Sequence, residues 1–121
     1  MHRASDVMRK TVPTVAPADS LARAAEIMGD FSARELPVVE DGAVVGIVAR
    51  SDLDPYVGQL EWTPVKVAMS APPRTVAPDT SVDAVARALL DGNFNGIPVV
   101  VGHLLAGMIT RHDLLRLLVK P

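Results

Sequence analysis

Apolar residues recur at helical spacing in two stretches of the chain, and polar residues separate them. One helical face is predicted by Leu21, Ala24, Ala25 and Met28, and a second by Val82, Val85, Ala86 and Leu89. Asp19 and Ser20 are good capping residues, and Thr80 with Asp83 resembles a capping box. We therefore expect two helices that begin at these caps and end near Gly29-Asp30 and Asp91-Gly92.

Each predicted helix is followed by two apolar runs with a short turn between them. Pro37 and Pro98 open the first runs, Asp41-Gly42 and Gly102-His103 form the turns, and the return strands are 43–49 and 104–110. This pattern predicts a β-hairpin in each half of the chain. Asp52 and Asp113 then begin a last helix, in which Pro55 fits only in the first turn.

The two halves are copies of one unit. Leu36-Pro37-Val38-Val39 recurs as Ile97-Pro98-Val99-Val100 at an offset of 61 residues, and the same offset joins Met8 to Met69 and the extended segment 14–17 to 75–78. We expect an α/β fold of two β-α-β-β-α repeats, 1–60 and 61–121, that pack with pseudo-two-fold symmetry and share a groove.

Composition narrows the range of functions. The chain has 121 residues, a net charge of −2 and no cysteine. Because its basic residues are scattered among acids, we expect no nucleic-acid partner. With no signal peptide and only strand-length apolar runs, we expect a cytoplasmic protein without a membrane span. The three histidines lack the spacing of metal ligands. The sequence shows neither a nucleophile paired with a base nor a phosphate-binding loop, so we do not expect an enzyme.

The repeated hairpin and the segments Gly46-Ile47-Val48-Ala49-Arg50-Ser51-Asp52 and Gly107-Met108-Ile109-Thr110-Arg111-His112-Asp113 resemble the cystathionine-β-synthase (CBS) motif, whose tandem pair is called a Bateman module. The resemblance covers roughly residues 5–119. It implies two clefts that often bind AMP, ADP, ATP or S-adenosylmethionine, frequent homodimers, and no required cofactor.

The main predicted site is built around Asp113. A carboxylate can accept charge-assisted hydrogen bonds from two neighbouring hydroxyls of a ribose at once. Thr110, three residues before Asp113, offers a hydroxyl of its own. The resemblance implies that the base lies between Met108 and the backbone of the other repeat, and that basic side chains neutralise phosphate. The full prediction for this site is Pro13, Ala33, Arg34, Met108, Thr110, Arg111, His112 and Asp113.

A second, weaker site is predicted in the other cleft, where Ala49 replaces Thr110. Loss of one hydrogen bond to a charged group costs about 1.5–3 kcal/mol, or roughly tenfold to hundredfold in affinity. Ser51 offers an alternative hydroxyl, which leaves this ranking open. The predicted residues are Ile47, Ala49, Ser51, Asp52, Arg74, Phe94 and Asn95.

Simpler interpretations stand beside these predictions. Asp52 and Asp113 also serve as helix caps, Thr110 as a strand residue, and Arg50 and Arg111 as solvated charges. The C-terminal leucines, Leu114, Leu115, Leu117 and Leu118, belong to the core or to a homodimer interface. Two functions remain: a sensor of an adenosine ligand that regulates a separate protein, and a ligand-free module for dimerisation or scaffolding.

Overall fold

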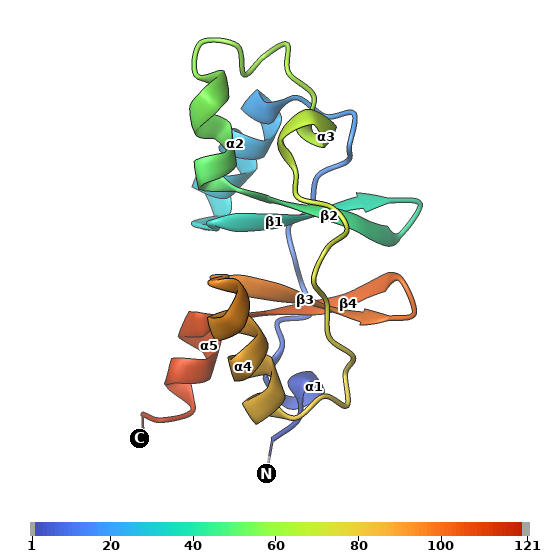
Figure 1. Ribbon diagram of the computed structural model, residues 1–121, viewed down its shortest axis with the longest axis vertical. Coiled ribbons are helices and arrows are strands. Elements are labelled where there is room, and N and C mark those ends of the chain that lie inside the picture. Colours follow the sequence, from blue (N-terminus) through green and yellow to red (C-terminus); the bar gives the residue numbers. More distant parts are fainter. Residues whose placement is uncertain (1, 120–121) are drawn as a thin grey trace. The chain divides into compact units, whose positions relative to one another are not determined.

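The computed structural model describes residues 2–119. Within it the chain forms two compact units (Figure 1). One is residues 13–73, and the other joins the segment before residue 13 to the chain from residue 74 onward.

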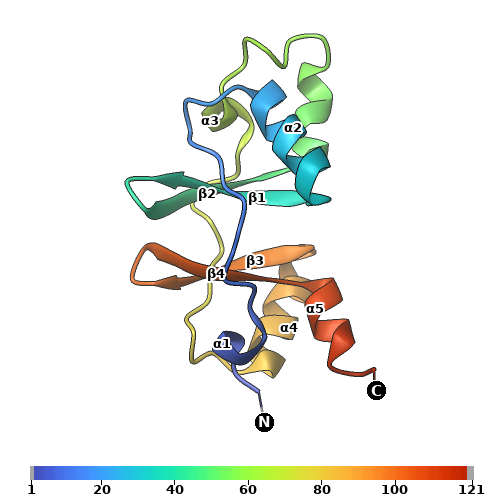
Figure 2. The ribbon, with the colours of Figure 1, turned by 180° about the vertical axis from the view of Figure 1, so that it is seen from behind.

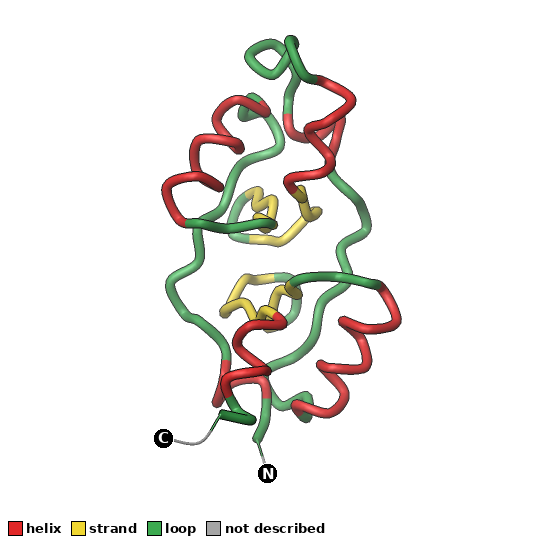
Figure 3. The backbone as a smooth tube through the Cα atoms, turned by 90° about the vertical axis from the view of Figure 1, so that its left-hand side faces the viewer, coloured by secondary structure: helices red, strands yellow, loops and turns green. Residues whose placement is uncertain are grey.

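The unit of residues 13–73 is a β-hairpin covered by helices. Its elements are α2 (Leu21–Phe31), β1 (Glu35–Glu40), β2 (Ala43–Ala49), the 3₁₀ helix η1 (Arg50–Tyr56) and α3 (Val65–Ala68). The helices lie on one side of the two strands (Figure 3). The fully buried side chains of its core include Leu21, Met28, Leu36, Val38, Val48 and Val65.

The other unit has the same plan. Its elements are α1 (Ala4–Val7), α4 (Val82–Gly92), β3 (Gly96–Val101), β4 (Leu104–Thr110) and α5 (Arg111–Arg116). Its core is built from Ala4, Val85, Leu89, Ile97, Val99 and Ile109. Each hairpin is antiparallel with a register shift at the same place, between Val38 and Val39 and between Val99 and Val100.

The predicted long helices are present, with one correction at a cap. Ser20 Oγ accepts the Arg23 N–H at 3.0 Å, and Ser81 Oγ accepts the Ala84 N–H at 3.1 Å. The expected capping box of Thr80 and Asp83 is wrong, because the Thr80 hydroxyl accepts the Ala77 N–H in the preceding turn. The helix therefore starts one residue later, and the caps of α2 and α4 are equivalent.

The predicted hairpins and extended segments are also present. Both strands β1 and β3 begin two residues before the expected prolines. Asp41 and Gly42 have φ values of 52° and 81°, as a tight hairpin turn with two left-handed residues requires. In the predicted extended segments, Val15 forms a parallel bridge with Val38 of β1, and Val76 forms a parallel bridge with Val99 of β3. The order β-α-β-β-α is thus confirmed in both repeats, with the first β element reduced to a single bridge and a short helix, α1 or α3, ahead of it.

The last helix of each repeat begins two residues before the expected aspartate, at Arg50 and Arg111. Pro55 is the sixth residue of η1, so its expected place in the first turn is wrong. Because the Asp52 carboxylate accepts the Ala49 N–H at 2.8 Å, the first turn forms ahead of Asp52. Pro55 then stands next to the last residue of a short 3₁₀ helix.

The compact units do not coincide with the repeats of the sequence, because the repeats exchange their first segments. The Ala4 N–H donates to the Thr80 carbonyl at 2.7 Å, and the equivalent Val65 N–H donates to the Asp19 carbonyl at 2.7 Å. Helix α1 thus lies beside α4 and the β3–β4 hairpin (Figure 2). Each unit is a repeat completed by the short helix that opens the other repeat.

Candidate ligand-binding site

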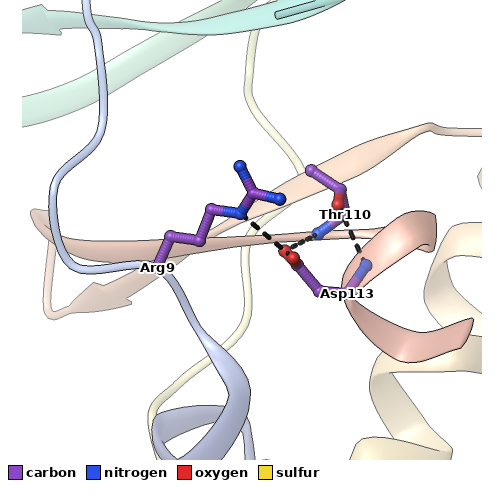
Figure 4. A network of polar contacts seen from close by, with 3 residues as sticks. All are labelled: Arg9, Thr110 and Asp113. Carbon is purple, nitrogen blue, oxygen red and sulfur yellow. Dashed lines mark hydrogen bonds and ion pairs between the residues drawn. The ribbon is translucent and has the colours of Figure 1, made fainter. Parts of the chain in front are cut away.

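Thr110 and Asp113 form a reciprocal pair at the junction of β4 and α5 (Figure 4). The Asp113 N–H donates to Thr110 Oγ1 at 3.2 Å, and the Thr110 N–H donates to Asp113 Oδ2 at 2.9 Å. Asp113 is buried, with 8% of its surface exposed. The two residues predicted to hold ribose therefore also cap α5, so the two interpretations of Asp113 are compatible.

Arg9 contacts the same carboxylate. Its Nε donates to Asp113 Oδ1 at 3.0 Å, while its side chain is 58% exposed (Figure 4). The Arg9 backbone is fixed on β4, because its N–H donates to the Met108 carbonyl at 2.9 Å and its carbonyl accepts the Met108 N–H at 3.0 Å. Arg9 was not among the residues predicted from the sequence. The sequence does mark Arg9 as a difference between the repeats, because it follows Met8 where Ser70 follows the equivalent Met69.

Gly107 allows Arg9 to come this close to β4. A Cβ at Gly107 would lie 2.6 Å from Met8 Sδ and 2.7 Å from the Arg9 carbonyl oxygen. Gly46 has the same role in the other unit, where a Cβ would lie 2.7 Å from Met69 Sδ. The glycine of the repeated motif is thus the position against which the exchanged segment packs.

Asp113 and Arg9 can each form further hydrogen bonds beyond the ones between them and with Thr110. Each Asp113 oxygen accepts one hydrogen bond and keeps a further lone pair. Among the described residues the Arg9 side chain donates through Nε, so the outer N–H groups of its guanidinium remain able to donate. The arrangement suits a ligand that carries both hydroxyl groups and a negative charge.

Arg111 has a structural role that the sequence analysis did not foresee. Its Nε donates to the Phe94 carbonyl at 2.5 Å, and an Nη donates to the Leu89 carbonyl at 3.3 Å. These carbonyls lie at the C-terminal end of α4 and just beyond it. Arg111 is therefore not a solvated charge, and a phosphate contact would compete with these bonds.

The other residues of the main prediction are divided between the two units. Met108 is buried and His112 exposed in the unit that holds Asp113. Pro13 and Ala33 are half-buried and Arg34 is exposed in the unit of residues 13–73. That these three residues complete the Asp113 site stays a prediction.

The second predicted site has the same carboxylate without the cation. Asp52 is half-buried, and its Oδ2 accepts the Ala49 N–H at 2.8 Å. Within residues 2–119 no ion pair to Asp52 is found. Ile47 and Ala49 are half-buried and Ser51 is exposed in the same unit, whereas Arg74, Phe94 and Asn95 belong to the other unit. The joining of these two groups also stays a prediction.

No helix between residues 2 and 119 is long and apolar enough to cross a membrane. The same residues contain no group of three or more His, Asp or Glu side chains placed to hold a metal ion.

Comparison with known families decides what these repeats are. The model of the CBS domain matches residues 4–58 and again residues 65–120. The chain belongs to the CBS domain family. The resemblance seen in the sequence is thereby confirmed, including the tandem arrangement of two CBS repeats.

CBS relatives occur as parts of larger proteins. The A-adding tRNA nucleotidyltransferase of Geobacter sulfurreducens is 32% identical over 118 residues, which are 96% of this chain and 13% of that protein. The chain spans between 13% and 31% of the length of the first curated relatives that it matches.

Solved CBS-pair structures have the same α/β fold. CBSX2 of Arabidopsis thaliana in complex with AMP matches with a TM-score of 0.88 and 28% identity, over 98% of this chain and 96% of that one. The CBS domain pair of protein MJ0100, in complex with 5′-methylthioadenosine and S-adenosyl-L-methionine, matches with a TM-score of 0.85, 28% identity and the same coverage.

Proposed function

We propose that this CBS pair is a regulatory module that binds an adenosine ligand and acts on a separate partner protein. The observation that carries the proposal is the Asp113 carboxylate, which is buried and oriented, and keeps lone pairs for a ribose diol. The AMP complex of CBSX2 and the S-adenosyl-L-methionine complex of MJ0100 support an adenosine ligand.

The proposed ligand site is built around Asp113, Thr110 and Met108. Thr110 contributes to it mainly by orienting Asp113, because its hydroxyl accepts the Asp113 N–H. The Asp52 site, with Ala49 at the equivalent cap, is the weaker of the two.

The module carries out no chemistry in this proposal. A ligand changes the conformation of a protein only as far as it binds one arrangement better than another. We therefore propose that occupancy of the Asp113 site favours one arrangement, which the partner protein then binds with altered affinity.

Titration calorimetry with AMP, ADP, ATP and S-adenosylmethionine tests the proposal. The matched variants are Asp113→Asn and Asp52→Asn, which remove one charge while each amide oxygen can still accept the capping N–H. We expect binding by the wild type, a loss of at least tenfold in Asp113→Asn and a smaller loss in Asp52→Asn, since hydrogen bonds to charged groups contribute about 1.5–3 kcal/mol. Absence of binding to all four compounds would contradict the proposal.

A second candidate function rests on helix α5 and the turn that follows it. Leu115 and Leu118 are 60% and 78% exposed, and Leu114 packs against the core. An apolar surface of this kind favours a homodimer, in which the chain serves as a ligand-free scaffold. Sedimentation equilibrium of the wild type and of Leu115→Glu/Leu118→Glu tests it: a dimer that the double variant converts to monomer supports the interface, and a wild-type monomer at micromolar concentration contradicts it.

A further inference from the structure

We propose that Arg9 determines specificity at the Asp113 site, so that this site selects a phosphorylated adenosine ligand over the uncharged nucleoside. The inference rests on the proposed function, which it deepens by naming the charge of the ligand. It follows from the comparison of the two repeats within this one chain.

Arg9 and Ser70 occupy the same place in their units. The backbone of Arg9 exchanges two hydrogen bonds with Met108 of β4, at 2.9 and 3.0 Å. The backbone of Ser70 exchanges two hydrogen bonds with Ile47 of β2, at 2.8 and 3.0 Å. The offset of 61 residues relates both pairs, so the two units differ here in the side chain and not in the course of the chain.

The aspartates are equivalent in the same sense. Asp113 Oδ2 accepts the N–H of residue 110 at 2.9 Å, and Asp52 Oδ2 accepts the N–H of residue 49 at 2.8 Å. Asp113 and Asp52 are therefore held by the same kind of hydrogen bond in their respective units. Within residues 2–119, an ion pair with a guanidinium is found for Asp113 and not for Asp52.

This difference changes which ligands each carboxylate tolerates. A carboxylate that accepts a ribose diol also repels a phosphate on the same nucleotide, because like charges at short range are unfavourable. Arg9 offsets the charge of Asp113 through Nε, and its outer N–H groups remain available to an anion. Ser70 supplies no such compensation next to Asp52.

The charges directly adjacent in sequence to Arg9 and Asp113 differ in the same direction, whereas Arg74 of the second predicted site stands where the main site has Pro13. Lys10 follows Arg9 where Ala71 follows Ser70, and His112 precedes Asp113 where Ser51 precedes Asp52. Arg111 and Arg50 are matched, and Arg111 is engaged with carbonyls near the end of α4. Arg9 is thus the cation whose contact with the carboxylate distinguishes the two units.

The position of Arg9 does not depend on a ligand. Its backbone is held on β4, and Gly107 provides the space for that contact. A cation fixed before binding loses little freedom when the ligand arrives, which favours selection at this position.

The test compares AMP with adenosine, which differ only in the phosphate. Calorimetry is carried out on Asp52→Asn protein, so that the Asp113 site dominates the signal, with Arg9 intact and with Arg9→Gln, Arg9→Lys or Arg9→Ser. Arg9→Gln keeps a hydrogen-bond donor and removes the charge, and Arg9→Ser copies the other repeat. Circular dichroism confirms the fold of each variant, and Ser70→Ala is the matched control.

With Arg9 intact we expect AMP to bind at least about tenfold more tightly than adenosine, since charge-assisted bonds are the stronger ones. In Arg9→Gln and Arg9→Ser we expect this ratio to fall to about threefold or less, whereas Arg9→Lys and Ser70→Ala retain it. The ratio with Arg9 intact also decreases with added salt, because an exposed guanidinium is screened.

An unchanged ratio in Arg9→Gln and Arg9→Ser would overturn the inference and leave the proposed function standing. Equal affinity for AMP and adenosine with Arg9 intact would do the same. Failure of both compounds to bind wild-type protein would overturn the inference, and failure of ADP, ATP and S-adenosylmethionine as well would overturn the adenosine-binding function itself.

Discussion

Arg9 Nε and Asp113 Oδ1 lie 3.0 Å apart, although 104 positions separate the two residues in the sequence. The contact joins the segment between α1 and α2 to the first turn of α5, within a single compact unit. It exists because the two CBS repeats exchange their first segments. The candidate site therefore depends on both repeats even where only one unit is considered.

Asp113→Ala is expected to destabilise the protein more than Asp52→Ala. Both variants lose a bond to a backbone N–H at the helix start, which costs about 0.5–2 kcal/mol. Asp113→Ala also leaves Arg9 without its carboxylate. Urea unfolding of the two variants measures the difference, and equal losses would show that the Arg9 contact contributes nothing to stability.

Gly107→Ala is expected to destabilise the protein and to displace Arg9. The new methyl group would meet Met8 Sδ at 2.6 Å and the Arg9 carbonyl oxygen at 2.7 Å, and the latter is backbone that must shift. Gly29→Ala is the matched control, since nothing lies within 4 Å of its Cβ position and alanine favours a helix interior by about 0.5–1 kcal/mol.

Thermal unfolding distinguishes the two glycines. We expect a lower melting temperature for Gly107→Ala and an unchanged or higher one for Gly29→Ala. A Gly107→Ala protein as stable as the wild type would mean that the exchanged segment does not pack against β4 as described.

Ser81→Ala is expected to cost about 1 kcal/mol of stability, and Thr80→Ala less. Ser81 is the N-cap of α4, with its Oγ on the Ala84 N–H at 3.1 Å, while Thr80 only closes the turn before the helix. Chemical denaturation of both variants tests the assignment. A larger loss in Thr80→Ala would favour the capping box that the sequence predicts.

Deletion of residues 2–9 is expected to expose the β3–β4 hairpin while sparing the β1–β2 hairpin. The deletion removes Ala4, which is fully buried in the core of the unit containing α4 and β3. Hydrogen exchange measures the two hairpins separately. Loss of protection in β1–β2 instead would contradict the exchange of first segments.

The repeats, the hairpins and the main helices are predicted from the sequence because each depends on local patterns. Turn residues such as Asp41-Gly42 and the spacing of Leu21, Ala24 and Met28 act within a few positions. The division of the chain into units is different. It depends on which repeat the segment around Ala4 packs against, and two copies of one pattern give the same local signal for either choice.

The candidate site shows the same limit. Asp113 and Thr110 are found from the sequence because the motif places them three residues apart at the end of a strand. Their capping role was also readable, since Thr110-Arg111-His112-Asp113 has the spacing of a capping box. Arg9 is not found in this way, because its contact with Asp113 follows from the packing of the exchanged segment on β4.

The central claim is that the Asp113 carboxylate binds an adenosine ligand. Its most direct test is calorimetric titration of AMP, ADP, ATP and S-adenosylmethionine into wild-type protein and into Asp113→Asn, with circular dichroism to confirm that both are folded. We predict saturable binding to the wild type and an affinity at least about tenfold lower in Asp113→Asn. Equal binding to both proteins, or none to the wild type, would contradict the account.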